Sequence, residues 1–151
     1  MFLQLMHLYF IIKVRIMKLR NKVYIMIYGI GIDIVEVKRI SNLIERWQEK
    51  FLDRIFTEKE IKYCQKKSDP FLHYAVRFAA KEAAGKMFGT GLGNVGWKDI
   101  EVLHNVNGNP YLNFRNKAEK EIIKNNIENV HLSLSHEKDY AVAQVVAEGG
   151  K

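Results

Sequence analysis

The sequence feature that most constrains the fold is an alanine-rich stretch over residues 77–88, Arg-Phe-Ala-Ala-Lys-Glu-Ala-Ala-Gly-Lys-Met-Phe. Alanine is the strongest helix former and has almost no side chain, so the stretch predicts a helix that other backbone or a ligand can approach closely. Pro70 suits the first turn of this helix, which we expect to run to about Phe88. We expect the rest of the chain to be organised around it.

Two charged residues of this stretch, Glu82 and Lys86, stand four positions apart and share one helical face. A surface ion pair worth roughly 0.2–0.5 kcal/mol is the simplest interpretation. A second carboxylate, Asp33, interrupts an apolar run from Ile25 to Val35 that predicts a buried strand. Such a carboxylate is costly unless it is paired, hydrogen-bonded or metal-bound. A structural or capping role for Asp33 is possible, and we favour a functional role because Glu82 is a second acid of this kind.

The other elements are predicted from periodicity, capping residues and turn residues. We expect helices over Val37–Phe51, Glu58–Lys67 and Asn116–Asn126, and strands over Asp99–His104, Tyr111–Phe114, Val130–His136 and Tyr140–Ala147. Thr57 and Glu60 match a capping box at the start of the second of these helices. At 151 residues, these elements fit one domain.

A glycine-rich loop, Gly89–Gly93, follows the central helix directly. The backbone N–H groups of such a loop can bind phosphate. This loop follows a helix rather than opening one, so it matches neither a P-loop nor a dinucleotide-binding fingerprint. A plain helix end with a flexible loop explains it equally well.

The positive charge of the chain is concentrated at its N-terminus. Residues 1–25 contain five basic residues and no acid, which leaves +2 of the total charge of +7 for residues 26–151. The main body is therefore only mildly basic, which argues against a nucleic-acid partner. A local positive patch for an anionic ligand remains compatible with this charge.

Residues 1–25 do not match a secretory signal, because the basic residues follow the apolar run of residues 1–12 instead of preceding it. That run is also too short to cross a membrane. We expect residues 1–25 to be a mis-called start or a non-essential extension, with the domain beginning at Met26. A helix lying on a membrane surface is the alternative. Cys64 is the only cysteine, which fits a reducing compartment. We expect a cytoplasmic protein without a membrane partner.

Asp33 and Glu82 together are a plausible pair of oxygen ligands for Mg²⁺, which one or two carboxylates, waters and substrate phosphates typically hold. Lys86 lies one turn beyond Glu82 and can neutralise a phosphate oxygen. Arg77, Lys81 and His136 offer further positive or hydrogen-bonding groups. The residues alone therefore suggest metal-assisted chemistry on a phosphate-bearing small molecule.

Four segments in order carry a more specific resemblance. They are Gly29-Ile-Gly-Ile-Asp-Ile-Val-Glu36, Arg77-Phe-Ala-Ala-Lys-Glu-Ala-Ala-Gly-Lys86, Asn107-Gly-Asn-Pro110, and Leu134-Ser-His136 with Tyr140-Ala141. Over about residues 26–147 the chain resembles the bacterial holo-[acyl-carrier-protein] synthases, which are small 4′-phosphopantetheinyl transferases. The resemblance implies an α+β fold with a small antiparallel sheet wrapped around a long central helix. It also implies a homotrimer with active sites between subunits.

The resemblance further implies a reaction that moves 4′-phosphopantetheine from coenzyme A to a serine of apo acyl carrier protein and releases adenosine 3′,5′-bisphosphate. Asp33 and Glu82 are expected to hold Mg²⁺, and Lys86 to stabilise charge on the pyrophosphate of coenzyme A. A metal-bound water or a nearby carboxylate is expected to take the serine proton. The remaining residues implied to bind coenzyme A are Arg77, Lys81, Gly89, Pro110 and His136, and those implied to face the acidic carrier protein are Arg39 and Arg46.

Two other functions compete with this one. A Mg²⁺-dependent nucleotide or pyrophosphate hydrolase would use the same acids and lysine without a protein substrate. An RNA-binding module would rely on the basic N-terminal extension and the lysine-rich helices, although no aromatic and basic recognition motif is visible.

Overall fold

The computed structural model describes residues 26–149, and the expectations for residues 1–25 lie outside this range. The helices are α2 (Val37–Trp47), α3 (Glu49–Ile55), α4 (Glu58–Gln65), α5 (Pro70–Met87) and α6 (Asn116–Lys124), with short 3₁₀ turns η1 (Gly91–Gly93) and η2 (Trp97–Asp99). The strands are β1 (Met26–Glu36), β2 (Ile100–His104), β3 (Pro110–Phe114), β4 (Ile127–His136) and β5 (Tyr140–Gly149).

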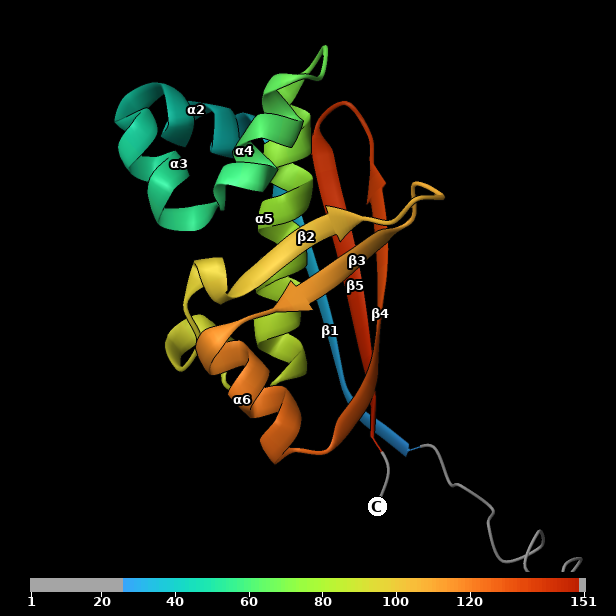
Figure 1. The fold of residues 1–151 in the computed structure, drawn as a ribbon. Helices are drawn as coiled ribbons and strands as arrows, with labels where there is room; N and C mark the ends of the chain where they lie inside the picture. The colour runs from blue at the N-terminus through green and yellow to red at the C-terminus, as the bar shows by residue number, and fades with distance from the viewer. Residues whose placement is uncertain (1–25, 150–151) are drawn as a thin grey trace, which may run out of the picture.

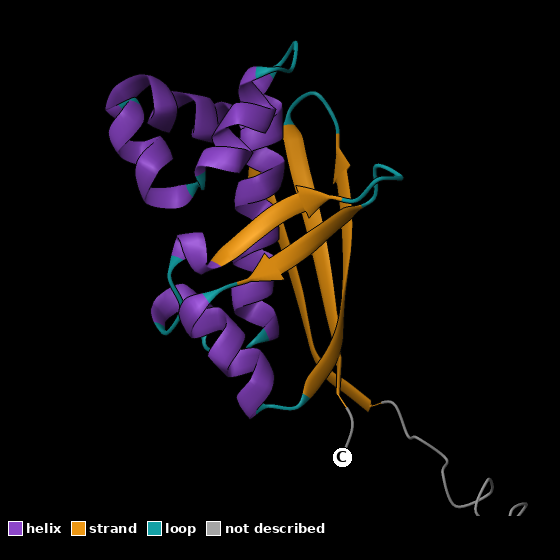
Figure 2. Ribbon diagram, viewed as in Figure 1, coloured by secondary structure: helices purple, strands orange, loops and turns teal. Residues whose placement is uncertain are grey.

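Helix α5 forms the centre of the molecule, as expected from its sequence. An antiparallel sheet in the order β1-β5-β4 lies along one side of α5, and the antiparallel pair β2-β3 crosses in front of the helix in Figure 1. Helices α2, α3 and α4 gather at one end, and α6 lies near the other end (Figure 2). This arrangement confirms the predicted α+β fold, with antiparallel strands packed around a long helix.

The sheet and α5 approach each other closely because both surfaces carry small residues. Ala79, Ala80, Ala83 and Ala84 of α5 are fully buried, as are Ala141, Ala143, Val145 and Ala147 of β5. On β1, a Cβ atom built at Gly31 would collide with the carbonyl oxygen of Ala83, and one at Gly29 with that of Met87. The two glycines therefore allow β1 to lie directly against the backbone of α5.

Most predicted helix and strand boundaries agree with the structure to within a few residues. Two helix caps, at the starts of α4 and α5, illustrate why. The side chain of Thr57 accepts from the backbone N–H of Glu60, and the backbone N–H of Thr57 donates to the Glu60 carboxylate, which completes the capping box of α4. Asp69 caps α5 by accepting from the N–H of Leu72 at 3.2 Å.

The expectation of one continuous helix over Val37–Phe51 is wrong. The chain breaks at Gln48, whose backbone adopts φ 46° and ψ −129° and divides the segment into α2 and α3. The N–H of Gln48 donates to the carbonyl of Ile44 at 2.7 Å, which closes the end of α2. The turn directs α3 back toward the core, where Ile55 and the following Phe56 are buried.

Over the described range 26–149, no helix combines the length and the apolar character that a membrane span requires.

Candidate active site

Strand β1 and helix α5 bring together three of the residues predicted from the sequence: Asp33, Glu82 and Lys86. We call these three residues the carboxylate cluster. The Nζ atom of Lys86 lies 2.9 Å from Oδ1 of Asp33 and also donates to the backbone carbonyl of Ile32 at 2.9 Å. The Asp33 side chain is 17% exposed and that of Lys86 is 51% exposed, so the pair lies at the surface with the acid on its inner side.

Glu82 belongs to the same cluster by its electrostatic environment. Burial raises the pKa of Glu82 and the negative charge of Asp33 raises it further, whereas Lys86 and Arg39 act in the opposite direction. A carboxylate whose pKa is raised by burial and by a neighbouring acid marks a site that a cation would stabilise. Within residues 26–149, no group of three or more His, Cys, Asp or Glu side chains is spaced to hold a metal. The carboxylate cluster offers two acidic side chains, those of Asp33 and Glu82.

A second polar group surrounds Arg77 on another side of α5. It comprises Tyr63, His73, Arg77, His104 and His136, and we call it the arginine–histidine cluster. The guanidinium of Arg77 lies 4.0 Å from the ring centre of Tyr63. The His104 ring stacks on the Tyr63 ring, with the two ring centres 4.7 Å apart. The rings of His73 and His136 are 6.2 Å apart.

Arg77 has binding capacity that the protein does not use. It is only 1% exposed, and its Nη1 donates to the carbonyl oxygen of His73 at 3.3 Å. Within residues 26–149, the Nε and Nη2 atoms of Arg77 have no hydrogen-bond partner, and neither does Nδ1 of His104. Burial lowers the pKa of both His73 and His104, and the charges of Arg77 and Lys67 lower them further. The cluster therefore holds a buried cation with free donors beside imidazoles that resist protonation.

Two further predicted residues lie near these groups. Pro110 opens β3 and pairs across the strands with His104, which brings it beside the arginine–histidine cluster. Gly89 follows the end of α5 with φ 77°, and its N–H donates to the carbonyl of Lys86 at 2.9 Å. Its positive φ explains why glycine ends this helix.

The carboxylate cluster and the arginine–histidine cluster face different sides of α5. Arg77 and Glu82 are five residues apart, which at 3.6 residues per turn separates their side chains by roughly 140° around the helix axis. Accordingly, Glu82 faces β1 and α2, whereas Arg77 faces α4 and β2. A single chain therefore presents the two groups in different directions.

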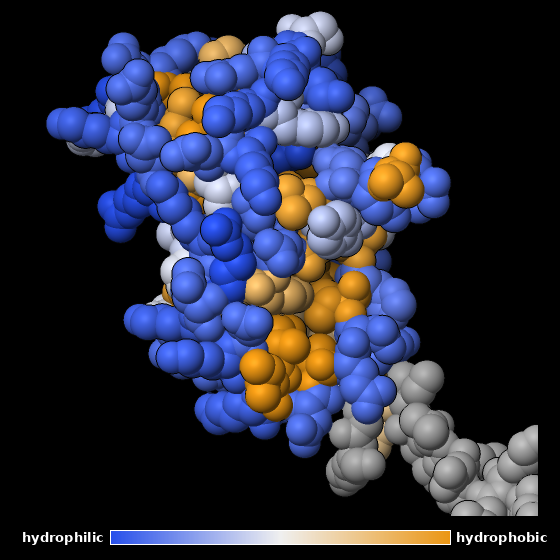
Figure 3. Space-filling view, in the orientation of Figure 1, coloured by the Kyte–Doolittle hydropathy of each residue, from blue (hydrophilic) through white to orange (hydrophobic). Residues whose placement is uncertain are grey.

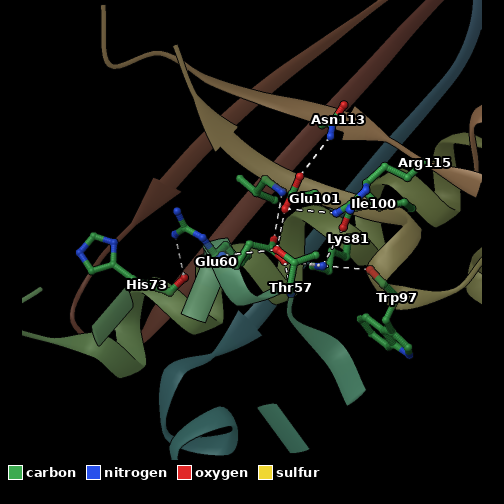
Figure 4. Close-up of polar contacts among 11 residues, drawn as sticks. Thr57, Glu60, His73, Lys81, Trp97, Ile100, Glu101, Asn113 and Arg115 are labelled. Carbon is green, nitrogen blue, oxygen red and sulfur yellow. Dashed lines mark hydrogen bonds and ion pairs between the residues drawn. The ribbon is translucent and has the colours of Figure 1, made fainter. Parts of the chain in front are cut away.

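Lys81, which the resemblance implied as a coenzyme A ligand, lies in neither cluster. Its side chain is fully buried, and its ammonium contacts Glu60 at 2.8 Å and the carbonyl oxygens of Trp97 and Ile100 at 2.9 and 2.6 Å (Figure 4). Burial lowers the pKa of Lys81, and the negative charge of Glu60 opposes that shift. All three donors of the ammonium are satisfied inside the protein.

The two arginines expected to face the carrier protein, Arg39 and Arg46, are exposed on α2. Beside them Leu43, Trp47, Lys50, Phe51 and Arg54 line a groove of about 560 Å³. Figure 3 shows apolar atoms between α2 and α3 ringed by hydrophilic residues. The end of the molecule that carries α2 and α3 therefore combines an apolar groove with a cationic rim.

The sequence analysis did not single out Tyr63, His73 or His104, nor Glu101 as a buried acid. Glu101 is 1% exposed and accepts from Thr57 at 2.7 Å and from Asn113 at 3.1 Å. Burial raises the pKa of Glu101, but these hydrogen bonds and the nearby Arg115 outweigh burial and lower the pKa overall. Glu101 could have been identified from its position in a predicted strand with alternating apolar residues, because a buried acid there requires a hydrogen-bond or ion-pair partner.

Comparisons with known proteins identify the family of the chain. The model of the 4′-phosphopantetheinyl transferase superfamily matches residues 29–145. The holo-[acyl-carrier-protein] synthase of Halothermothrix orenii is 48% identical over 125 residues, which cover 83% of this chain and all of the relative. All three residues of the carboxylate cluster lie within the matched range of the superfamily.

Solved structures show the same relationship. The holo-[acyl-carrier-protein] synthase of Neisseria meningitidis superimposes with a TM-score of 0.76 at 40% identity, covering 81% of this chain and 98% of the relative. The synthase of Bacillus anthracis, solved in complex with CoA (3′,5′-ADP), gives a TM-score of 0.68 at 42% identity over 82% of this chain and 98% of the relative. Sequence, fold and carboxylate cluster together show that this chain belongs to the 4′-phosphopantetheinyl transferase superfamily and groups with its holo-[acyl-carrier-protein] synthases.

Proposed function

We propose that the protein transfers 4′-phosphopantetheine from coenzyme A to a serine of apo acyl carrier protein and releases adenosine 3′,5′-bisphosphate. The observation that carries the proposal is the carboxylate cluster, where Lys86 lies 2.9 Å from Asp33 and beside Glu82 in a chain of this superfamily. The likeness to a synthase solved in complex with CoA (3′,5′-ADP) supports coenzyme A as the donor.

The carboxylate cluster fits Mg²⁺. Asp33 and Glu82 are two oxygen donors on neighbouring elements. The pKa of Glu82 is raised by burial and then by the charge of Asp33, and a divalent ion would offset that charge. Asp33 and Glu82 would hold the ion, which when bound supplies Lewis-acid polarisation of the phosphate oxygens.

The residues of the chain have distinct tasks in the reaction. The serine oxygen of the carrier protein forms a bond to the phosphorus on the pantetheine side of the pyrophosphate, and the bond from that phosphorus to the bridging oxygen breaks. Lys86 is half-exposed, and its ammonium would leave Asp33 to neutralise charge on the departing bisphosphate. The serine proton needs an acceptor, and we assign that task to a water or carboxylate beside the phosphate, because the oxygens of Glu82 would hold the ion.

The other phosphate of coenzyme A requires a second anion site, which the arginine–histidine cluster provides. Arg77 has two free donors there, and Pro110 and His136 border the same cluster. Because this cluster and the carboxylate cluster face different sides of α5, we propose that one coenzyme A bridges two copies of the chain. We leave Lys81 out of the binding set because its ammonium is used inside the protein.

A homotrimer is the assembly that we propose for this bridging. Ile30, Ile32 and Ile34 of β1 point away from α5 and are 58, 58 and 64% exposed. Three exposed isoleucines on one face of a strand need cover in solution. An assembly that covers this strand would bring the clusters of neighbouring copies together.

The carrier protein is proposed to dock on α2 and α3. Arg39 and Arg46 offer positive charge to an acidic partner, and the groove beside Trp47 and Phe51 offers apolar contact. Arg39 also acts on the pKa of Glu82, so the docking surface adjoins the carboxylate cluster. We place the reaction in the cytoplasm, which suits the free, buried thiol of Cys64.

The test is intact-mass spectrometry of apo acyl carrier protein incubated with the protein, coenzyme A and Mg²⁺. We expect a gain of one phosphopantetheine that disappears with EDTA, with Asp33→Ala and with Glu82→Ala. A chain beginning at Met26 should react equally well, because we propose that residues 1–25 are not essential. No gain with several carrier proteins, together with turnover of a nucleotide pyrophosphate, would instead favour a hydrolase.

A further inference from the structure

The buried ion pair between Glu60 and Lys81 has no counterpart in the reaction proposed above. Both side chains are fully buried, and Nζ of Lys81 lies 2.8 Å from Oε2 of Glu60. Figure 4 shows the pair at the meeting point of α4, α5, η2 and β2. A buried pair is expensive to desolvate and contributes little net stability, so its presence calls for another explanation.

The pair is connected to backbone from every neighbouring element. Besides Lys81, Glu60 accepts from the N–H of Thr57 at 2.9 Å and from the N–H of Val102 at 3.0 Å. Lys81 donates to the carbonyls of Trp97 and Ile100. The ammonium therefore has a fixed position relative to η2 and β2, and the carboxylate relative to α4 and β2.

Apart from the half-exposed contacts of Lys86 with Ile32 and Asp33, the rest of the α5 surface offers few directional contacts. Its buried faces are dominated by alanines, and β1 contacts it through Gly29 and Gly31. Small side chains hold two elements close together, but they interlock weakly along the helix axis. Lys81 differs from them because its three contacts each specify a direction and a length.

Lys81 is also adjacent to the residues that matter for the chemistry. It directly precedes Glu82 and lies five residues before Lys86 in the same helix. Any movement of α5 along its axis would carry Glu82 and Lys86 past Asp33, which is held on β1. An error of about 1 Å in such a site is enough to cost roughly 10²-fold in rate.

We propose that Glu60 and Lys81 are positioning residues that set the axial position of α5, and with it the placement of Glu82 and Lys86 against Asp33. This proposal rests on the transferase function proposed above for the carboxylate cluster. It replaces the expectation that Lys81 binds coenzyme A with a role inside the protein.

The test compares two variants with the wild-type chain. The double variant Glu60→Gln/Lys81→Met removes both charges together, which avoids leaving one buried ion unpaired, and keeps similar side-chain volumes. The control variant Val145→Ala opens a cavity on the opposite side of α5, on β5, and leaves the Glu60–Lys81 contacts in place. Both variants are assayed at a temperature where thermal melts show them fully folded.

Two readouts are needed. The first is phosphopantetheine transfer, with kcat and KM for coenzyme A measured separately. The second is the affinity for Mn²⁺ alone, followed by isothermal titration calorimetry, which requires no catalysis. We expect the double variant to lose at least about tenfold in kcat and to bind Mn²⁺ more weakly, whereas Val145→Ala keeps both values near wild type despite a lower melting temperature.

Retention of kcat and Mn²⁺ affinity by the double variant would overturn the proposal. Equal losses in Val145→Ala would also overturn it, because they would show that general destabilisation is sufficient. If the wild-type chain transfers nothing, the proposed function fails. In that event the Mn²⁺ titrations still decide whether Glu60 and Lys81 position the carboxylate cluster.

Discussion

The ammonium of Lys86 lies 2.9 Å from the carboxylate of Asp33, a residue 53 positions earlier in the chain. Without a ligand, the Lys86 ammonium is therefore already paired with Asp33. A bound pyrophosphate would have to compete with Asp33 for this ammonium. The contact is half-exposed, so the lysine can exchange partners at low cost.

Replacement of Lys86 by methionine should reduce kcat for the transfer by about 10²–10³-fold, because the charge that develops on the leaving bisphosphate loses a cation. Lys86→Arg keeps the charge and should retain more activity. The measurement is steady-state kinetics with coenzyme A and apo carrier protein. Lys62→Met, on an exposed residue of α4, is the matched control and should behave like wild type. A Lys86→Met variant with unchanged kcat would exclude the role assigned to Lys86.

Gly31→Ala should lower both stability and activity. The added methyl group meets the carbonyl oxygen of Ala83, which belongs to the backbone of α5 and has nowhere to move. Overpacking of this kind costs typically about 1–3 kcal/mol. Chemical denaturation and the transfer assay check both effects, and Gly93→Ala, where a Cβ meets nothing within 4 Å, is the control. Equal behaviour of the two variants would show that the strand is not held against the helix in this way.

Glu82→Gln should abolish transfer and yet raise the melting temperature near neutral pH. The folded-state pKa of Glu82 is raised by burial and by Asp33, so the folded protein binds this proton more tightly than the unfolded chain does. The ionised Glu82 therefore lowers the stability of the folded protein. This loss is absent below the pKa that Glu82 has in the unfolded chain, grows as pH rises toward its pKa in the folded protein, and is complete above that pKa. The gain from Glu82→Gln should therefore be seen at pH 8 and vanish near pH 4.

Melts at both pH values, with and without Mg²⁺, test this interpretation. Mg²⁺ should stabilise the wild-type chain at pH 8 and leave Glu82→Gln almost unchanged, because the variant lacks one of the two carboxylates. A Glu82→Gln chain that is less stable than wild type at pH 8 would contradict the predicted penalty.

Binding of coenzyme A should take up protons. Burial, followed by Arg77 and Lys67, holds the pKa of His73 and His104 below the ordinary value, and a phosphate beside Arg77 would raise both. Affinity should therefore weaken as pH rises from the lowered pKa values of the free protein, which lie below the ordinary histidine value of about 6.5, to the raised values of the complex. Calorimetry in buffers of different ionisation enthalpy measures the uptake, and the double variant His73→Gln/His104→Gln should reduce it. Identical uptake in that variant would place the protons elsewhere.

Ile32→Lys should disrupt the proposed homotrimer. Ile32 is 58% exposed on the outer face of β1, where a buried lysine would be costly in an interface between copies. Sedimentation velocity should show a smaller species for the variant and reduced transfer at equal chain concentration. Ile123→Lys on α6, where Ile123 is 69% exposed, is the control and should leave the assembly intact. A wild-type chain that sediments as a monomer would refute the trimer directly.

The parts of the fold that follow from local rules could be predicted from the sequence. The capping box at Thr57 marked the start of α4, and Pro70 marked that of α5, because both signals act within a few residues. Asp33 could be identified because an acid in an apolar strand needs a partner. The residues alone suggested Glu82 as a second acidic ligand beside it and Lys86 as a cation for phosphate, and the structure pairs Lys86 directly with Asp33.

The remaining features depend on contacts that no local pattern contains. The helix breaks at Gln48, which adopts a positive φ of 46°. Glutamine rarely adopts such a φ, so the residue type gives no indication of the break. The internal contacts of Lys81 could not be predicted from the sequence, because its acceptors lie 16 to 21 positions away along the chain. His73 and His104 join one cluster only after α5 and β2 are packed.

The contact between β1 and α5 has a consequence for how this protein can change over generations. At Gly29 and Gly31 the opposing atoms are the carbonyl groups of Met87 and Ala83, which every amino acid carries in the same place. A larger residue at either glycine could not be accommodated by trimming its neighbour, because no substitution shortens a carbonyl group. A change where two side chains meet can be compensated by a change in the partner, but Gly29 and Gly31 face backbone atoms and have no such partner.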